Sequence, residues 1–138
     1  YIHYEISNFS KLGFESKHNL TYWNNKEYYG FGLGASGYIN GFRYENTKNI
    51  NNYCEGKYRF KESLLSKQEM MENEIILGLR KIKGINLQEF FDKYEVNIQD
   101  VFPVKPLLKS KELRYKNGHI YINPDQLYVM NEILIKLI

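Results

Sequence analysis

The segment ELRYKNGHIYIN, residues 112–123, is the feature that most restricts the fold. Asn117-Gly118 lies between two runs of strand-like side chains, and this dipeptide is a strong hairpin signal because both turn positions need positive φ. A two-residue turn pairs Tyr115 with Ile120 and Leu113 with Ile122. Paired side chains of this kind share one face, so the hairpin needs a hydrophobic layer against it.

Helices before the hairpin can supply that layer. Ser66 and Glu69 have the spacing of a capping box, and Leu65 and Met70 that of a hydrophobic staple. One helical face then carries Met71, Ile75, Leu79 and Ile82, and Gly84 suits the helix end. The pattern predicts a long helix that starts at residue 66.

Two shorter helical segments and a final helix complete this region. Asn86 and Glu89 can cap a helix whose apolar side chains are Leu87, Phe90, Phe91 and Tyr94, and a turn or helix over Ile98–Phe102 ends before Pro103. After the hairpin, Asn123-Pro124-Asp125 starts a helix with Pro at its first position. Its buried stripe is Leu127, Met130, Leu134 and Leu137. Three helices, a hairpin and a last helix are the order of a winged-helix module.

Residues 1–65 have a different character. Residues 1–45 are rich in Gly, Tyr and Asn, and the expected strands are Ile2–Ser7, Tyr29–Gly34 and Gly37–Tyr44, with an aromatic loop over 18–29. Ile50, Tyr53 and Cys54 fall at helical spacing before Gly56, and 57–65 resembles a linker. The expected fold is α+β. The chain opens at Tyr1, without Met and directly in a strand, so we expect a piece of a longer protein.

The loop GFGLGASG contains G-x-G-x-x-G at Gly32, Gly34 and Gly37, the spacing of a dinucleotide-binding loop. That site needs a helix directly after the glycines, whose N-terminus binds the pyrophosphate. Here YINGFRYEN follows and reads as β-structure with an Asn40-Gly41 turn, which argues against a dinucleotide site. Glycines in a strand allow close approach of another backbone or of a ligand, and the sequence does not separate these two.

Composition excludes little. The net charge is +3, and aromatic residues make up 16% of the chain, with 13 Tyr. Such aromatics suit broad surfaces that are partly apolar and partly polar. Cys54 is the single cysteine and cannot form an internal disulfide, which favours the reducing cytoplasm. No apolar run is long enough for a membrane span, and no signal peptide is visible.

A DNA-binding module is one alternative. The basic residues Lys105, Lys109, Lys111, Arg114 and Lys116 lie within twelve residues and could contact phosphates. The expected recognition segment 97–102 carries Asp100 and no Lys or Arg, however, whereas a helix in the major groove usually presents base-reading side chains. Nucleic acid is therefore an unfavoured partner, and a solvated basic face explains the cluster.

The densest chemical patch is His18-Asn19-Leu20-Thr21-Tyr22-Trp23. An imidazole can bind heme iron, and aromatic faces can pack on the macrocycle. The plainer alternative is that His18 hydrogen-bonds nearby backbone while Trp23 fills the core. His3 and His119 show no metal-ligand spacing with Cys54 or a carboxylate, and Met70 and Met71 suit a core better than a heme site.

Two runs carry a family resemblance: YEISNFSKLGFESKHNLTYW, and YYGFGLGASGYINGFRYEN after it. With the later ILGLRKIKGINLQEF, they resemble the oxygen-independent coproporphyrinogen III oxidase-like family of radical S-adenosylmethionine proteins. The specific part is Tyr4-Glu5-Ile6-Ser7-Asn8-Phe9 followed by His18-Asn19-x-x-Tyr22-Trp23. The second motif looks like the heme-chaperone branch.

The resemblance implies a domain plan. The family has a partial barrel that holds a 4Fe–4S cluster through C-x-x-x-C-x-x-C and binds S-adenosylmethionine. That motif is absent from these residues, so the chain should lack radical activity by itself and have the missing N-terminal radical domain as its partner. Residues 1–45 would be the last barrel strands, 46–65 a helix and linker, and 66–138 the C-terminal helical domain. Gly32, Gly34 and Ala35 would edge the S-adenosylmethionine pocket; at Ser36 many relatives carry His.

The implied function is heme binding and delivery to an acceptor that the sequence does not name. His18 would be the iron ligand, Tyr22 and Trp23 would shape the pocket, and Asn19 would orient the loop. The alternative within the family is a coproporphyrinogen III oxidase of porphyrin biosynthesis, in which this segment would close the active site.

Overall fold

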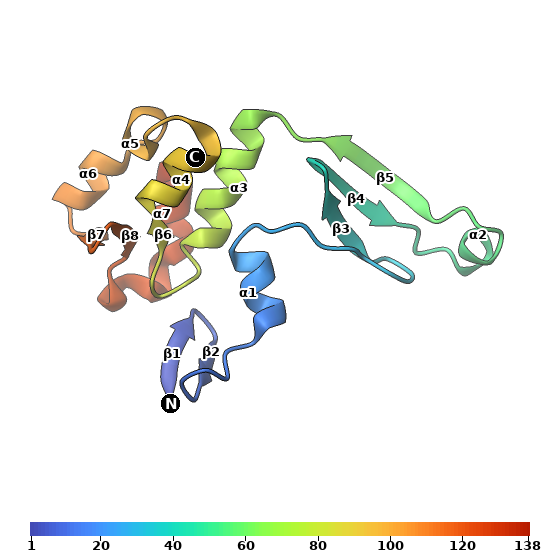
Figure 1. The fold of residues 1–138 in the computed structure, drawn as a ribbon, viewed down its shortest axis with the longest axis horizontal. Helices are drawn as coiled ribbons and strands as arrows, with labels where there is room; N and C mark the ends of the chain where they lie inside the picture. Colours follow the sequence, from blue (N-terminus) through green and yellow to red (C-terminus); the bar gives the residue numbers. More distant parts are fainter.

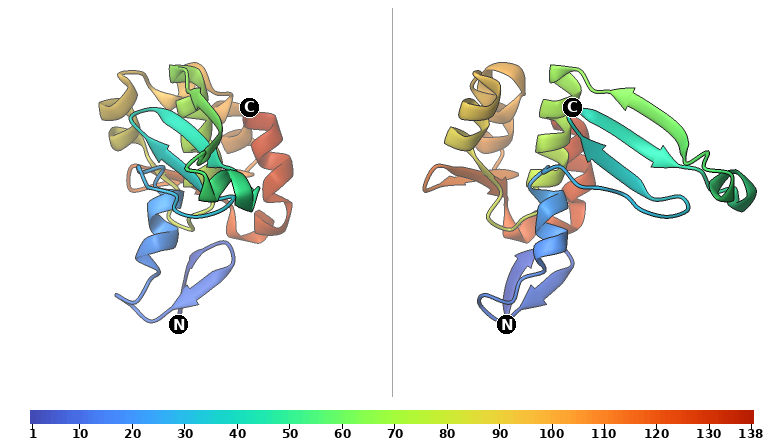
Figure 2. Two further views of the ribbon diagram at one scale, coloured as in Figure 1. Left: turned by 90° about the vertical axis from the view of Figure 1, so that its right-hand side faces the viewer. Right: turned by 45° about the vertical axis from the view of Figure 1, so that its right-hand side comes forward.

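The computed structural model describes residues 1–138, which form three connected parts (Figure 1). The first holds a hairpin and one helix: β1 (Ile2–Glu5), β2 (Asn8–Ser10) and α1 (Lys17–Trp23). The second is a projecting sheet with a short helix at its far end: β3 (Ser36–Ile39), β4 (Phe42–Asn46), α2 (Ile50–Cys54) and β5 (Arg59–Leu64). The third is a helical part, from α3 (Lys67–Gly78) to α7 (Met130–Leu137). The right-hand view of Figure 2 shows the sheet standing away from the helices, and α1 contacts α3.

The helical part contains the hydrophobic core. Between α3 and α7 it holds β6 (Ile85–Asn86), α4 (Leu87–Tyr94), α5 (Ile98–Val101), α6 (Val104–Lys109), β7 (Leu113–Lys116), β8 (His119–Ile122) and a 3₁₀ segment, Pro124–Val129. All 17 residues of the buried cluster lie between Met71 and Leu137. Ile75, Phe90 and Ile133 are among the most deeply buried of them, each at most 1% exposed. The expected α+β fold, with helices around a hairpin, is confirmed.

The hairpin has the predicted turn and register. Asn117 and Gly118 both have positive φ, of 49° and 74°. Leu113 pairs with Ile122 and Tyr115 with Ile120, as predicted. One detail was wrong, because Tyr115 is 60% exposed while the other three are buried. The helices cover only part of the hairpin face and leave its turn end open.

The helix caps are confirmed, but the first long helix is shorter than predicted. Ser66 and Glu69 form both hydrogen bonds of the capping box, and the Asn86 side chain caps α4. The helix ends at Gly78, not Gly84. The reason is tertiary, because the chain after Gly78 bonds to the N-terminal hairpin: Ile6 N–H donates to Arg80 O (2.9 Å) and Ile82 N–H to Tyr4 O (3.2 Å).

Other expectations for the first half also need correction. The expected aromatic loop over 18–29 begins with the helix α1, and the expected linker 57–65 contains the strand β5. The expected strand Tyr29–Gly34 is a loop, and the expected strand Gly37–Tyr44 is a hairpin of β3 and β4 that turns at Asn40-Gly41. The helix over Ile50–Cys54 is confirmed, and the expected strand Ile2–Ser7 is present but ends at Glu5. No helix has the length and apolar character that crossing a membrane requires.

The capping box gives a pH-dependent prediction. Ser66 N–H donates to Oε2 of Glu69 (2.7 Å), and this bond lowers the pKa of Glu69 below 4.5. A carboxyl whose pKa is lower in the folded state stabilises the fold above its unfolded pKa, and this contribution is lost as pH falls through the folded pKa. Glu69→Gln should therefore be less stable than the unaltered chain at neutral pH and equal to it in strong acid. Urea unfolding from neutral pH to strong acid measures the difference in stability between the two proteins. A difference that persists in strong acid contradicts the prediction.

Candidate functional site

A row of aromatic rings starts on α1. The Ser16 side chain caps this helix by accepting a hydrogen bond from Asn19 N–H (3.3 Å). His18 and Tyr22 lie one turn apart and therefore on the same helix face. Their ring centroids are 4.7 Å apart at an interplanar angle of 88°, and Tyr28 continues the row, 4.5 Å from Tyr22. The sequence predicted the first two members, and the fold adds Tyr28.

The imidazole of His18 is available to a ligand. His18 is exposed, and neither of its ring nitrogens has a hydrogen-bond partner in the protein, unlike His3 and His119, which contact backbone carbonyls. The alternative in which His18 bonds to neighbouring backbone is therefore not what the structure shows. An exposed imidazole beside a tyrosine edge can bind a metal through one nitrogen while the flat part of a ligand contacts the rings.

The other two motif residues have structural positions. Trp23 lies beneath Arg80 of the segment after α3, with the guanidinium carbon 5.4 Å from the ring centroid, and its Nε1 is buried without a partner. Trp23 therefore packs α1 against the helical part. Asn19 contributes its backbone N–H to the helix cap. Both residues support the helix that presents His18.

A cleft of about 230 Å³ lies beside the aromatic row. It is lined by Tyr22, Asn25, Lys26, Tyr28, Ser36, Arg43 and Leu77. Burial raises the pKa of the Tyr28 hydroxyl, so this group stays protonated. Arg43 reaches Asn73 Oδ1 (3.5 Å) and has no carboxylate partner. The cleft thus combines aromatic faces with cationic groups. Arg43 could not be predicted from local sequence, because it comes from β4 and not from α1.

The glycine loop is held by a buried asparagine. Asn46, 4% exposed, donates from Nδ2 to the carbonyls of Gly30 (3.2 Å) and Gly32 (3.0 Å). Gly34 N–H donates to Thr47 O, and Ala35 O accepts from Asn46 N–H. These backbone groups thus form their hydrogen bonds within the protein. This agrees with the alternative in which the glycines allow close approach of another part of the chain. The positive φ of Gly32 (97°) and Gly34 (65°) explains why glycine stands at both positions.

An aromatic cleft of about 440 Å³ opens beside this loop, away from His18. Its lining is Tyr29, Gly30, Phe31, Tyr44, Asn46, Tyr53, Tyr58 and Arg59. Phe31 is 85% exposed and Tyr29 67% exposed, while the Arg59 guanidinium stacks 3.3 Å from the Tyr44 ring centroid. Gly30 lines this cleft, and Gly32 is hydrogen-bonded to its lining residue Asn46, whereas Gly34, Ala35 and His18 do not line it.

Two other expectations can be placed on the structure. No group of three or more His, Cys, Asp or Glu side chains is arranged to hold a metal ion, and Cys54 is exposed. Among the basic residues, Lys105 and Lys109 lie on α6, and Arg114 and Lys116 on β7. The segment between α4 and α6 that would have to read DNA, α5, has only four residues, of which Ile98 is buried.

Comparisons with known proteins agree with the fold. Residues 65–125 match the family described as HemN C-terminal domain. A solved structure described as coproporphyrinogen III oxidase (HemN) from Escherichia coli, a radical SAM enzyme, superposes with a TM-score of 0.63. That superposition covers 80% of this chain and 28% of the other at 15% identity, which supports the fold alone. Residues 65–125 are therefore similar to the HemN C-terminal domain in sequence, and the fold of the chain is similar to that of the HemN structure.

Two relatives are similar over nearly the whole chain. The protein named heme chaperone HemW from Lactococcus lactis is 38% identical and covers 100% of this chain. The one of the same name from Bacillus subtilis is 37% identical and covers 94%. The chain thus resembles the C-terminal part of proteins named heme chaperone HemW. It spans 38% and 36% of the length of these two relatives.

Proposed function

We propose that this chain is the C-terminal part of a radical S-adenosylmethionine heme chaperone, and that His18 binds the heme iron. The observation that carries the proposal is the exposed His18 ring, free of hydrogen bonds, at the end of a row with Tyr22 and Tyr28. The relatives named heme chaperones support the same reading. Heme is the cargo here, and its acceptor would be a separate protein.

The proposal includes the domain plan. Residues 1–45 would complete a partial barrel whose remaining strands, 4Fe–4S cluster and S-adenosylmethionine site lie outside this chain. The exposed aromatic cleft around Phe31 supports this, because a large apolar surface of this kind fits contact with another domain or ligand. Residues 66–138 would be a separately packed domain, since the buried core lies within them. The single exposed Cys54 is consistent with the cytoplasm as the location.

The test is a heme titration followed by the Soret absorbance, with this chain and with the full-length protein. His18→Ala should weaken heme binding by at least about tenfold, because even the loss of a residue that only orients a ligand costs this much in metal sites. His3→Ala is the matched control, since His3 already contacts Phe9 and the Ile6 carbonyl, and it should bind heme normally.

Comparing this chain with the full-length protein shows whether the chain alone contains the heme site. A His18-dependent Soret shift in both places the heme site within these 138 residues, and a shift in the full-length protein alone means that the missing domain completes it. Equal heme affinity of His18→Ala and the unaltered protein in both forms would show that His18 is not the ligand.

A further inference from the structure

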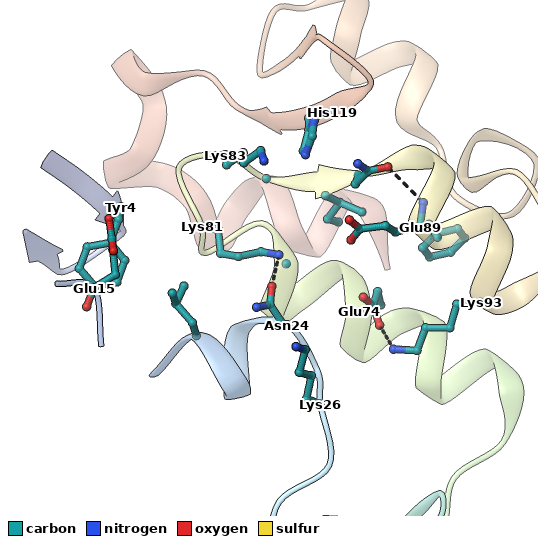
Figure 3. A pocket seen from close by; sticks show the side chains of 16 residues that line it. Tyr4, Glu15, Asn24, Lys26, Glu74, Lys81, Lys83, Glu89, Lys93 and His119 are labelled. Carbon is teal, nitrogen blue, oxygen red and sulfur yellow. Dashed lines mark hydrogen bonds and ion pairs between the residues drawn. The ribbon is translucent and has the colours of Figure 1, made fainter. Parts of the chain in front are cut away.

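A further cavity lies on the other side of α1 from His18. Leu20 of α1 and Asn24 directly after this helix line it. Leu20 is two positions from His18, so its side chain points about 200° away from that of His18. The cavity measures about 570 Å³ and lies between α1, α3, α4 and the strands β6 and β8 (Figure 3). Only four of its 16 lining residues are hydrophobic, so its ligand should be polar.

The lining has an excess of positive charge. Its basic side chains are Lys26, Lys81, Lys83, Lys93 and His119, and its acidic side chains are Glu15, Glu74 and Glu89. Lys93 is already paired with Glu74 at 2.6 Å, and the same Glu74 oxygen accepts from Tyr94 and Asn25. Lys26, Lys81 and Lys83 form no ion pair with any carboxylate, although Glu15 and Glu89 lie at the same cavity.

Lys81 is the central cation of the cavity. Its ammonium donates to Asn24 Oδ1 at 2.6 Å, a neutral oxygen (Figure 3). Burial lowers the pKa of Lys81, and the nearby carboxylates of Glu74 and Glu89 oppose this shift without pairing with it. The backbone of Lys81 is fixed by its bridge to Glu5. Burying an ammonium group partly, without a counter-ion, is unfavourable in free energy. A bound anion would offset this unfavourable term.

We propose that this cavity is an oxyanion site, in which Lys81 binds a carboxylate or phosphate group of a small molecule. Lys83 and His119 extend over the cavity from the side opposite Asn24 and Lys26 (Figure 3), so the anion is met by donors from two directions. If the proposed function holds, one source of the carboxylate is a propionate of the tetrapyrrole. The other source is free phosphate. The site itself depends on neither, since it does not involve His18.

The experiment uses the full-length protein and probes without iron, so that His18 ligation plays no part. Binding is measured for inorganic phosphate by calorimetry, and for metal-free protoporphyrin and its dimethyl ester by fluorescence. Lys81→Met should weaken the binding of phosphate or of protoporphyrin about tenfold or more, because it removes a charge-assisted hydrogen bond. Lys116→Met is the matched control, since it removes an equal charge from an exposed position of β7 that does not line the cavity.

The results of this experiment either identify the source of the bound anion or contradict the proposed site. A Lys81-dependent phosphate affinity identifies a free anion, and Lys81-dependent protoporphyrin binding that the dimethyl ester lacks identifies a propionate. Equal affinities of Lys81→Met and Lys116→Met for every probe overturn the proposal, as does tight binding of the ester alone. If Lys81→Met fails to fold, Lys83→Met and Lys26→Met take its place at two exposed positions, and unchanged affinity in both overturns the proposal. A failed heme titration at His18 would leave these results unaffected.

Discussion

Gly84→Ala is expected to lower the free energy of unfolding by about 3 kcal/mol or more, the sum of a left-handed backbone and an overpacked contact. Gly84 has φ of +74°, and a Cβ there would lie 1.9 Å from the Ile120 carbonyl oxygen and 2.6 Å from Tyr121 Cβ. These atoms belong to β8, the central strand of the sheet with the order β6-β8-β7. An added methyl group can be accommodated only if the turn before β6 separates from β8.

Gly118→Ala is a closely matched control for this substitution. Gly118 has the same φ of +74°, but a Cβ there would meet nothing within 4 Å. Its free energy of unfolding should fall by only about 1 to 2 kcal/mol, the energy of holding alanine in the left-handed conformation. Urea unfolding of both variants measures the difference, which isolates the contact with β8. If both variants lose the same free energy of unfolding, β8 accommodates the added methyl group at Gly84 without loss of stability.

Glu74→Ala is expected to lower the free energy of unfolding by about 2 to 3 kcal/mol, because it removes a partly buried charge with several donors. The carboxylate on α3 accepts from Tyr94 of α4 (3.0 Å), from Asn25 after α1 (3.1 Å) and from Lys93 (2.6 Å). Burial and the nearby Glu74 charge raise the pKa of Tyr94, so its hydroxyl remains a donor. Asn25 is buried and would lose its partner.

Glu72→Ala on the same helix is the control. Glu72 accepts one exposed hydrogen bond from Gln68, and surface substitutions of this kind usually change stability by about 0.5 kcal/mol or less. The free energies of unfolding of the two variants, measured by urea titration, test the difference. If the two losses are equal, Glu74 does not join α1 to the helical part.

Local sequence signals predicted the features that depend on local chemistry. The caps at Ser66 and Asn86 and the turn at Asn117-Gly118 are set by side chains within three residues of the backbone they bond. The turn at Asn117-Gly118 also determines the pairing register of β7 and β8. The His18–Tyr22 pair was predictable for the same reason, because its members lie four residues apart.

The errors all concern features that distant residues decide. All six side chains of β5 are exposed, so the strand shows no apolar alternation and exists through its pairing with β4. The helix α1 has seven residues and no buried one, and its position depends on Trp23 and Asn25 contacts with the helical part. Arg43 and Lys81 join their clefts from separate elements, which no spacing along the chain reveals.

The confinement of the buried cluster to residues 71–137 has a consequence for the time scale of motion. Amides in α3 and α7 should exchange with solvent only when this whole core opens, whereas those of β3, β4 and β5 are protected by a sheet with little core of its own. Proteins commonly divide into such units of unequal local stability. Here the weaker unit carries the glycine loop and the aromatic cleft, so this cleft can open and close while the helical part stays folded.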